Sequence, residues 1–373
     1  MPPVVINLRK ADDSRDVVHR AVQTLSEGKL VVFPTETVYG VGALARSAKA
    51  VARIYDAKGR GQDAPLALAI RGVEDALDYA PRLNARAERL ARRCWPGPVT
   101  LVVAHGQPSL VDQLPAEVRQ AVAPSGEVGL RVPAHWAVLD VLQMIAGPIA
   151  LTSANRSGEP PATTAEDALR QLGDKVSLVL NDGPCHYGQA STVVRATADG
   201  IECLREGVVS RETLDRLASM LIVVVCTGNT CRSPMAEAML RQMIAQKAGC
   251  QVDELESRGL TIASAGIAAA AGGPAATEAV EVMKSQGLDI TCHQSQPLTD
   301  KLAHHADMLL TLTAAHRNAI LRRWPEVAAR THTLRPDGGD IADPIGGPLE
   351  VYKQCASQIE QALRERVEEI DLN

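Results

Sequence analysis

A cysteine and an arginine six positions apart carry the sharpest chemical pattern in the sequence, within Cys226-Thr-Gly-Asn-Thr-Cys-Arg-Ser-Pro234. The segment follows an apolar run and precedes a predicted helix, so its backbone N–H groups and the helix N-terminus would form an anion-binding loop. We expect Arg232 to bind two phosphate oxygens, and the positive surroundings to favour a nucleophilic thiolate at Cys226. Attack on phosphorus would give a cysteinyl-phosphate, with Ser233 donating a hydrogen bond to the sulfur.

A proton donor for the leaving group is expected at Asp343, which precedes a proline in a glycine-rich loop. Its carboxylic acid would protonate the leaving group and then act as a base toward water. An isolated Asp-Pro pair more often marks only a turn. Cys231 is either a small loop residue or the partner of Cys226 in a reversible disulfide. The predicted phosphate loop consists of Thr227, Gly228, Asn229, Thr230 and Cys231.

Residues 220–373 resemble the low-molecular-weight protein tyrosine phosphatases along nearly their full length. The resemblance implies Cys226 as nucleophile, Arg232 as transition-state binder and Asp343 as acid. Thr230 stands where tyrosine-specific members carry Ile, and Ile345 follows Asp-Pro where they carry aromatic residues. Both features are similar to the protein-arginine phosphatase branch, so phosphoarginine is favoured and phosphotyrosine stays open. The motifs shared with the family are the loop 226–233, Ser264-Ala-Gly266, Pro297-Leu-Thr299 and Asp343-Pro344.

The first part of the chain has no such compact motif. It contains no Walker A pattern, and Gly40-Val-Gly-Ala-Leu-Ala45 lies too far beyond the preceding strand for a dinucleotide fingerprint. Polar residues are instead scattered over loops bounded by Gly and Pro, where binding residues concentrate. Taken singly, each cation is more commonly a solvated surface residue. Positive charge for a triphosphate could come from Lys58, Arg60, Arg131 and Arg205, and hydrogen bonds to phosphate or ribose from Ser153 and Asn155.

Residues from about 12 to 210 resemble the YrdC-type threonylcarbamoyl-AMP synthases through Pro34-Thr-Glu-Thr-Val-Tyr-Gly40, Lys58-Gly-Arg60 and Ser153-Ala-Asn155. The resemblance implies synthesis of L-threonylcarbamoyl-AMP and pyrophosphate from L-threonine, bicarbonate and ATP, toward N6-threonylcarbamoyladenosine in tRNA. Ala69 stands where many members carry His, which weakens the case for threonine more than for ATP. The implied ATP contacts are Lys58, Thr100, Ser153 and Arg205, with Arg60 and Asn155 beside them, and the implied threonine contacts are Thr35, Arg131, Thr152 and Ser191.

The cofactor and partners follow from the same reasoning. No carboxylate cage for a metal is evident, so we expect no dedicated metal site and Mg²⁺ arriving with ATP. A phosphoprotein is the expected substrate of the second part, and a tRNA-modifying transferase complex is a possible partner downstream of the first. An alternative is that the first part is a silent nucleotide- or RNA-binding module that regulates a tyrosine phosphatase. Aromatic residues make up only 2% of the chain, which argues against RNA binding by base stacking.

Composition indicates a globular protein of two domains. The chain has 373 residues, a net charge of −5 and 46% hydrophobic residues. It shows no membrane-spanning run and no signal peptide, and its eight scattered cysteines fit reduced thiols in the cytoplasm. The helix expected over 210–219, followed by Met220 and an apolar run, indicates a joint between domains 1–219 and 220–373.

The expected fold class is α/β in both domains. For 220–373 we expect a small doubly wound parallel sheet of the phosphatase type, because strands and helices alternate. For 1–219 we expect a twisted, open, mixed sheet of the YrdC type. Predicted strands are 30–33, 66–70, 99–103, 149–151, 177–180, 192–194, 201–204, 221–225, 260–264 and 307–311, and predicted helices are 48–57, 165–172, 234–248 with Pro234 at its first position, 275–286, 314–322 and one from about 348.

Overall fold

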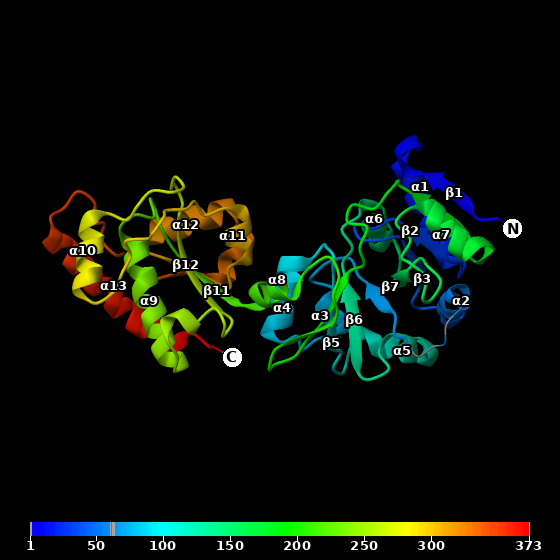
Figure 1. Ribbon diagram of the computed structural model, residues 1–373, viewed down its shortest axis with the longest axis horizontal. Helices are drawn as coiled ribbons and strands as arrows, with labels where there is room; N and C mark the ends of the chain where they lie inside the picture. Colours follow the sequence, from blue (N-terminus) through cyan, green and yellow to red (C-terminus); the bar gives the residue numbers. More distant parts are fainter. Residues whose placement is uncertain (1, 60, 62–63, 373) are drawn as a thin grey trace. The chain divides into compact units, whose positions relative to one another are not determined.

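The computed structural model describes residues 2–59, 61 and 64–372, and it divides into two compact units. The first unit runs through Ala218 and the second begins at Ser219, one residue before the joint expected from the sequence. Figure 1 colours the first unit from blue to green and the second from green to red. Across the described residues, no helix has the length and apolar character needed to cross a membrane.

The described residues of the first unit form a ten-stranded mixed sheet in the order β1-β8-β2-β3-β7-β4-β6-β5-β9-β10. The sheet contains both parallel pairs, such as β4 with β6, and antiparallel pairs, such as β3 with β7, which confirms the predicted mixed sheet. The strands are β1 (Val4–Asn7), β2 (Val31–Phe33), β3 (Gly40–Leu44), β4 (Ala67–Ala69), β5 (Val99–Ala104), β6 (Glu127–Arg131), β7 (Ile149–Ser153), β8 (Leu178–Asn181), β9 (Thr192–Ala196) and β10 (Ile201–Arg205).

Both faces of this sheet are covered. In β2, Val31 and Phe33 pack with α1 and α6, whereas Val32 faces the larger core on the opposite side, as the two-residue period of a strand requires. Burial on both faces explains why β2 is a continuous apolar run. The helices of this unit are α1 (Ser14–Ser26), α2 (Ala48–Lys58), α3 (Ala76–Tyr79), α4 (Ala85–Cys94), α5 (Ala116–Val122), α6 (Trp136–Met144), α7 (Ala165–Leu172) and α8 (Arg211–Ala218).

Two segments that the sequence analysis did not predict as strands are strands in the structure. Residues 40–44 form β3, where a Cβ on Gly42 would lie 2.7 Å from the side chain of Ile149 on β7. That glycine therefore serves close strand packing, in agreement with the rejection of a dinucleotide fingerprint. Residues 127–131 form β6, so Arg131 lies at the end of a strand and not in a loop.

The second unit contains a four-stranded parallel sheet in the order β12-β11-β13-β14, within the described residues. All its pairs are parallel, which confirms the predicted doubly wound architecture. The central strand β11 ends at Cys226, with the second strand on one side and the third on the other, so the cysteine lies at the switch point where such sheets bind ligands. The strands are β11 (Met220–Cys226), β12 (Leu260–Gly266), β13 (Met308–Thr311) and β14 (Thr331–Thr333).

Helices cover both faces of this sheet (Figure 1). Ile222 and Val224 pack toward α9, α10 and α13, and Val223 and Val225 pack toward α11 and α12. Helix α9 begins at Arg232, so the expectation that Pro234 opens it is wrong by two residues. Pro234 is tolerated there because the first-turn N–H groups have no partner within the helix. The helices are α9 (Arg232–Ala248), α10 (Thr277–Ser285), α11 (Asp300–His305), α12 (Ala314–Arg323) and α13 (Leu349–Glu369).

Candidate active sites

The sulfur of Cys226 lies at the base of the loop that joins β11 to α9. The residue is 3% exposed. Its Sγ lies 2.9 Å from Ser233 Oγ, and the backbone N–H of Asn229 donates to it at 3.3 Å. The loop therefore closes around the sulfur, with the N-terminus of a 17-residue helix directly behind it.

Asn229 holds the loop in its curved shape. It is fully buried and has a φ of 55°, a conformation that asparagine tolerates better than most residues. Its Nδ2 donates to Ser233 Oγ at 2.9 Å and to Ser264 Oγ at 2.8 Å, and its Oδ1 accepts from the N–H of Gln296 at 2.8 Å. The loop also packs tightly on β12, where a Cβ on Gly266 would lie 2.4 Å from a loop carbonyl oxygen. These contacts explain why Ser and Gly occupy the first and last positions of the Ser264-Ala-Gly266 motif.

Arg232 and Asp343 meet at this loop. The Arg232 side chain is 6% exposed, and its Nη1 donates to the Ile341 carbonyl at 3.1 Å. Its Nη2 pairs with Asp343 Oδ2. Asp343 Oδ1 accepts from the N–H of Ile345 at 3.2 Å, so the carboxylate also forms the local turn typical of Asp-Pro. Asp343 therefore forms a turn and also lies beside the phosphate loop. Of its side chain, 41% remains exposed.

His316 also contacts the loop, and the sequence analysis did not identify it. It lies in α12, is 5% exposed, and its Nε2 is 2.8 Å from Thr227 Oγ1. Its Nδ1 is buried without a hydrogen-bond partner among the described residues. Burial and, next, the charge of Arg232 hold the pKa of His316 below its ordinary value, so the imidazole is neutral at pH 7. No spacing pattern connects a histidine in α12 to this loop 89 positions earlier.

The remaining loop residues face α13 and the start of α10. Cys231 Sγ lies 3.5 Å from the hydroxyl of Tyr352, and burial together with this contact raises the pKa of that phenol. Thr230 is half-buried, with Oγ1 3.6 Å from Cys231 Sγ and its carbonyl accepting from the Ala276 N–H. Cys226 and Cys231 are both free thiols. A disulfide between them stays a prediction.

A cavity of about 320 Å³ opens among the strands of the first unit. Strands β5, β6, β7 and β9 contribute to its wall, together with the segment that follows β2. The cavity brings together residues from seven separate parts of the chain, among them β4 and β10. Of the predicted binding residues, seven line it, namely Thr35, Thr100, Arg131, Thr152, Ser153, Ser191 and Arg205.

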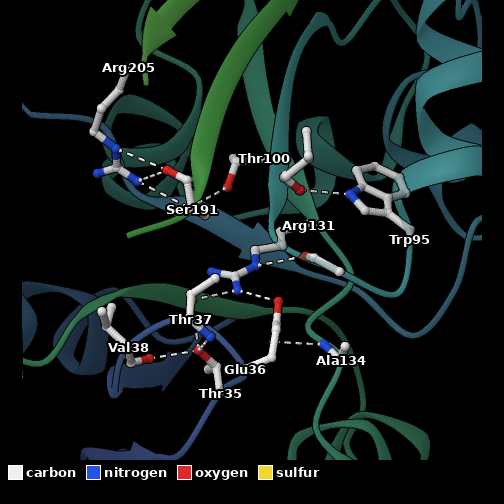
Figure 2. A network of polar contacts seen from close by, with 12 residues as sticks. Thr35, Glu36, Thr37, Val38, Trp95, Thr100, Arg131, Ala134, Ser191 and Arg205 are labelled. Atoms are coloured by element: carbon white, nitrogen blue, oxygen red, sulfur yellow. Dashed lines mark hydrogen bonds and ion pairs between the residues drawn. The ribbon is translucent and has the colours of Figure 1, made fainter. Parts of the chain in front are cut away.

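Arg131 lies at the centre of a polar network in this cavity (Figure 2). Its Nη2 donates to Glu36 Oε1 at 2.7 Å and to Thr37 Oγ1 at 2.8 Å, and its Nε to the Gly97 carbonyl at 3.4 Å. The side chains of Arg131 and Glu36 are each 9% exposed. Thr35 belongs to the same segment, with Oγ1 2.9 Å from Thr37 Oγ1.

A second cation faces the same space from the edge strand β10 (Figure 2). Arg205 Nη2 donates to the Ser191 carbonyl at 2.8 Å and to Ser191 Oγ at 3.0 Å. Thr100 Oγ1 lies 3.3 Å from Ser191 Oγ on the other side. Partial desolvation and, next, the charge of Arg131 lower the pKa of Arg205. Two guanidinium groups close enough to influence each other make this wall suitable for an anion.

Lys58 and Asn155 lie beside the cavity and are not among its lining residues. Lys58 ends α2, is 3% exposed, and its Nζ donates to the carbonyls of Ser153 at 2.5 Å and Asn155 at 2.8 Å. Asn155 Oδ1 is buried without a partner among the described residues. The structure therefore connects Lys58 to the wall through Ser153, and Arg60 lies outside the described residues.

The sequence analysis missed further lining residues at one end of the cavity. Glu127 on β6 and Arg195 on β9 form an ion pair at 3.0 Å, and both line the cavity. Only the pairing of distant strands brings them together. Within the described part of the chain, no group of three or more His, Cys, Asp or Glu residues could hold a metal ion.

Comparison with known proteins assigns each unit to a family. The Sua5/YciO/YrdC family model, described as "Telomere recombination", matches residues 23–207. The model described as "Low molecular weight phosphotyrosine protein phosphatase" matches residues 221–373. This chain therefore joins a member of the Sua5/YciO/YrdC family to a member of the low-molecular-weight phosphatase family.

Individual relatives agree with this assignment. A putative threonylcarbamoyl-AMP synthase of Mycobacterium tuberculosis is 39% identical over 56% of this chain and 90% of that protein. A protein-arginine-phosphatase of Bacillus subtilis is 36% identical over 40% of this chain and 97% of that protein. The crystal structure of Pyrococcus abyssi Sua5 complexed with L-threonine is 26% identical, with a TM-score of 0.52, over 70% of this chain and 92% of that one.

Some relatives are larger than the region they share with this chain. The chain matches 60% of the length of the threonylcarbamoyl-AMP synthase of Pyrococcus abyssi, at 36% identity over 57% of its own residues.

Proposed function

We propose that the chain is a bifunctional enzyme. The first unit makes L-threonylcarbamoyl-AMP from L-threonine, bicarbonate and ATP, and the second removes phosphate from phosphoarginine in proteins. The observation that carries the first half is the cavity, which gathers three arginines and seven hydroxyl-bearing side chains from separate segments of the chain. The observation that carries the second half is the phosphate loop closed around Cys226 Sγ, with Arg232 and Asp343 beside it.

The cavity supplies what the first reaction requires. Threonine and bicarbonate condense with loss of water to a carbamate, whose oxygen attacks the α-phosphorus of ATP as the bond to pyrophosphate breaks. The transition state adds negative charge on phosphate oxygens, which preorganised guanidinium and hydroxyl donors stabilise best. Arg205 with Ser191 and Thr100 would face the nucleotide, and Arg131 with Thr35 would face the amino acid.

Mg²⁺ enters this reaction as part of the nucleotide substrate. A cation carried by ATP needs one or two carboxylates at most, because phosphate oxygens and water fill its other positions. Lys58 and Asn155 would contact ATP from beside Ser153, and such contact requires Lys58 Nζ to exchange a carbonyl partner for a phosphate oxygen.

The phosphatase reaction uses the groups that meet at the phosphate loop. The Cys226 thiolate attacks phosphorus, the bond to the substrate nitrogen or oxygen breaks, and Asp343 gives its proton to the leaving group. Water then attacks the cysteinyl-phosphate with Asp343 as base, which releases inorganic phosphate and the thiolate. Ser233, at 2.9 Å from the sulfur, stabilises the departing thiolate by a hydrogen bond. A bound phosphate dianion would compete with Asp343 for Arg232, which frees the carboxyl group for proton transfer.

Phosphoarginine is favoured over phosphotyrosine by the surroundings of the loop. Ile345, next to the proposed acid, is 70% exposed and is aliphatic, so no aromatic ring at that position can stack on a phenyl group. Thr230 carries a hydroxyl that would add polarity to the substrate pocket. The Bacillus subtilis relative is a protein-arginine-phosphatase.

The first activity is tested by pyrophosphate release from ATP by the purified full-length chain. We expect release only when L-threonine and bicarbonate are both present, whereas release that ignores threonine would contradict the proposal. In the cell, the unstable adenylate would pass to a tRNA-modifying transferase complex. Eight free thiols support a cytoplasmic, reducing location.

The second activity is tested by comparing kcat/KM for a phosphoarginine peptide and a phosphotyrosine peptide of the same sequence. We expect the phosphoarginine peptide to be preferred. A preference for phosphotyrosine would contradict the proposal and would indicate that the second unit is a tyrosine phosphatase.

A further inference from the structure

Glu36 connects three loops that enclose the cavity of the first unit. It lies three residues after β2, and its Oε2 accepts from the N–H of Ala134, three residues after β6. Its backbone carbonyl accepts from the N–H of Tyr187 at 2.9 Å, in the loop between β8 and β9. In the sheet, β2 and β6 are separated by three strands, so this carboxylate bridges segments that strand pairing does not join.

The same carboxylate orients Arg131. Its Oε1 accepts from Nη2 of Arg131 at 2.7 Å, and Thr37 Oγ1 accepts from the same nitrogen at 2.8 Å. The Gly97 carbonyl accepts from Nε. Within the described chain, Nη1 of Arg131 has no hydrogen-bond partner, so its two N–H groups remain for a ligand. Figure 2 shows the guanidinium held between the segment 35–37 and the strand that carries it.

Burial makes this arrangement rigid. Both side chains of the ion pair are 9% exposed, so neither charge is screened by bulk water. A rotation of Arg131 would leave the Glu36 carboxylate with an unpaired buried charge, which is strongly unfavourable. The pair therefore restricts the guanidinium to one orientation before substrate arrives, and such preorganisation lowers the cost of binding.

We infer that Glu36 is a positioning residue that fixes Arg131 for the carboxylate of the amino-acid substrate. The inference rests on the proposed synthase function and deepens it. Glu36 takes no part in the chemistry, and its own carboxylate is occupied by Arg131 and Ala134. Arg131 thus presents the N–H groups of Nη1 in a fixed direction, which suits a charge-assisted hydrogen bond to a carboxylate oxygen.

The test is steady-state kinetics of Glu36→Gln in the full-length chain, with threonine and ATP varied separately. In glutamine an NH2 donor replaces one of the two carboxylate oxygens, so the amide would turn a donor toward either Arg131 or the Ala134 N–H. We expect the KM for threonine to rise by about tenfold, the scale of one hydrogen bond to a charged group. The KM for ATP should stay within about twofold of wild type, because only the amino-acid end is disturbed. A threonine KM that is unchanged or lower, or an equal rise in both constants, would overturn the inference.

A double-mutant cycle separates positioning from a general structural role. If Glu36 acts through Arg131, then adding Glu36→Gln to Arg131→Gln should change threonine affinity by no more than about twofold. Additive losses would overturn the inference. Should Glu36→Gln fail to fold, Glu36→Asp keeps the charge with a shorter reach, and it should give an intermediate threonine KM. Asp75→Asn, which removes the exposed ion pair with Arg71, is the matched control and should leave both constants unchanged.

Failure of the inference and failure of the proposed function give different results. If the wild-type chain releases no pyrophosphate in response to threonine and binds no threonine by calorimetry, the synthase assignment itself falls. If the wild type responds to threonine and the Glu36 variants keep its threonine KM, only the role of Glu36 falls.

Discussion

In the second unit, the groups that would contact phosphate come from one continuous segment, 226–233, whereas the cavity of the first unit draws its polar side chains from six separate segments. The loop relies on backbone N–H groups at the N-terminus of α9, so its positive potential is built into the main chain. The cavity relies on the side chains of Arg131 and Arg205, whose positions depend on Glu36 and Ser191. An anion site made of backbone N–H groups should be little affected by substitution of neighbouring side chains. A site made of arginine side chains should be weakened by substitution of any residue that orients those arginines.

The largest effect is expected at the nucleophile of the loop. Cys226→Ser should reduce hydrolysis of phosphoarginine and of a generic aryl phosphate by at least about a thousandfold, because a serine hydroxyl does not ionise as a thiol does. Initial rates of phosphate release measure the effect. Cys292→Ser changes the exposed cysteine of the same unit and should leave the rate intact. Hydrolysis that survives Cys226→Ser would show that another group attacks phosphorus.

The next effect concerns the cation beside the cavity. Lys58→Ala should lower threonine-dependent pyrophosphate release by about a hundredfold or more, because it removes a charge that stabilises phosphate in the transition state. Arg60→Ala should act in the same direction. Lys175→Ala removes an exposed lysine that also donates to a backbone carbonyl, and it should have no effect. Normal rates in both the Lys58 and Arg60 variants would place the nucleotide elsewhere.

A smaller effect is expected for specificity at the loop. Thr230→Ile adds a methylene and removes a hydroxyl from a half-buried position. We expect it to shift the ratio of kcat/KM toward phosphotyrosine by about 10- to 100-fold, the range that one such change produces in a pocket. The ratio is measured with both peptides in both forms of the protein. An unaltered ratio would mean that Thr230 does not line the specificity pocket.

The smallest expected effect is on the pH dependence of the free energy of unfolding. It involves His316, which contacts Thr227. Burial lowers the pKa of His316 below its ordinary 6.5, so the unfolded chain takes up this proton at a higher pH than the folded protein. Below about pH 6.5 the unfolded state therefore holds more protons, and the free energy of unfolding falls as the pH falls. His316→Gln keeps a donor for Thr227 and removes the titration, so its stability should decrease less between about pH 7 and pH 5.

Calorimetric unfolding of the second unit at the two pH values measures this difference. The control is His19→Gln, which changes an exposed histidine of the first unit and should behave as wild type. An identical pH dependence in wild type and His316→Gln would contradict the buried neutral imidazole.

The sequence predicted local features well and long-range ones poorly. The helix 165–172 agrees with α7, and the strands 221–225, 260–264 and 307–311 lie within one residue of the starts of β11, β12 and β13, because hydrophobic periodicity is a local property. Strands β3 and β6 contain glycines and were not predicted as strands. In β3, Gly40 and Gly42 are explained by the close approach of side chains on β7, which a single segment does not reveal.

The same distinction holds for the sites. The spacing of Cys226 and Arg232, together with the apolar run before them and the predicted helix after them, identified the phosphate loop. The residues of the cavity were grouped only by family resemblance. Glu36 and Arg131 are 95 positions apart, and His316 and Thr227 are 89 apart. Such pairs are fixed by the order of strands and by which helix covers which face, so they become visible only in the folded chain.

The most direct test of the account measures both activities on the same three proteins: wild type, Cys226→Ser and Lys58→Ala. The account predicts that Cys226→Ser loses phosphoarginine hydrolysis and keeps threonine-dependent pyrophosphate release, and that Lys58→Ala does the reverse. Loss of both activities in either folded variant, or the absence of threonine-dependent release in wild type, would contradict two separate active sites in one chain.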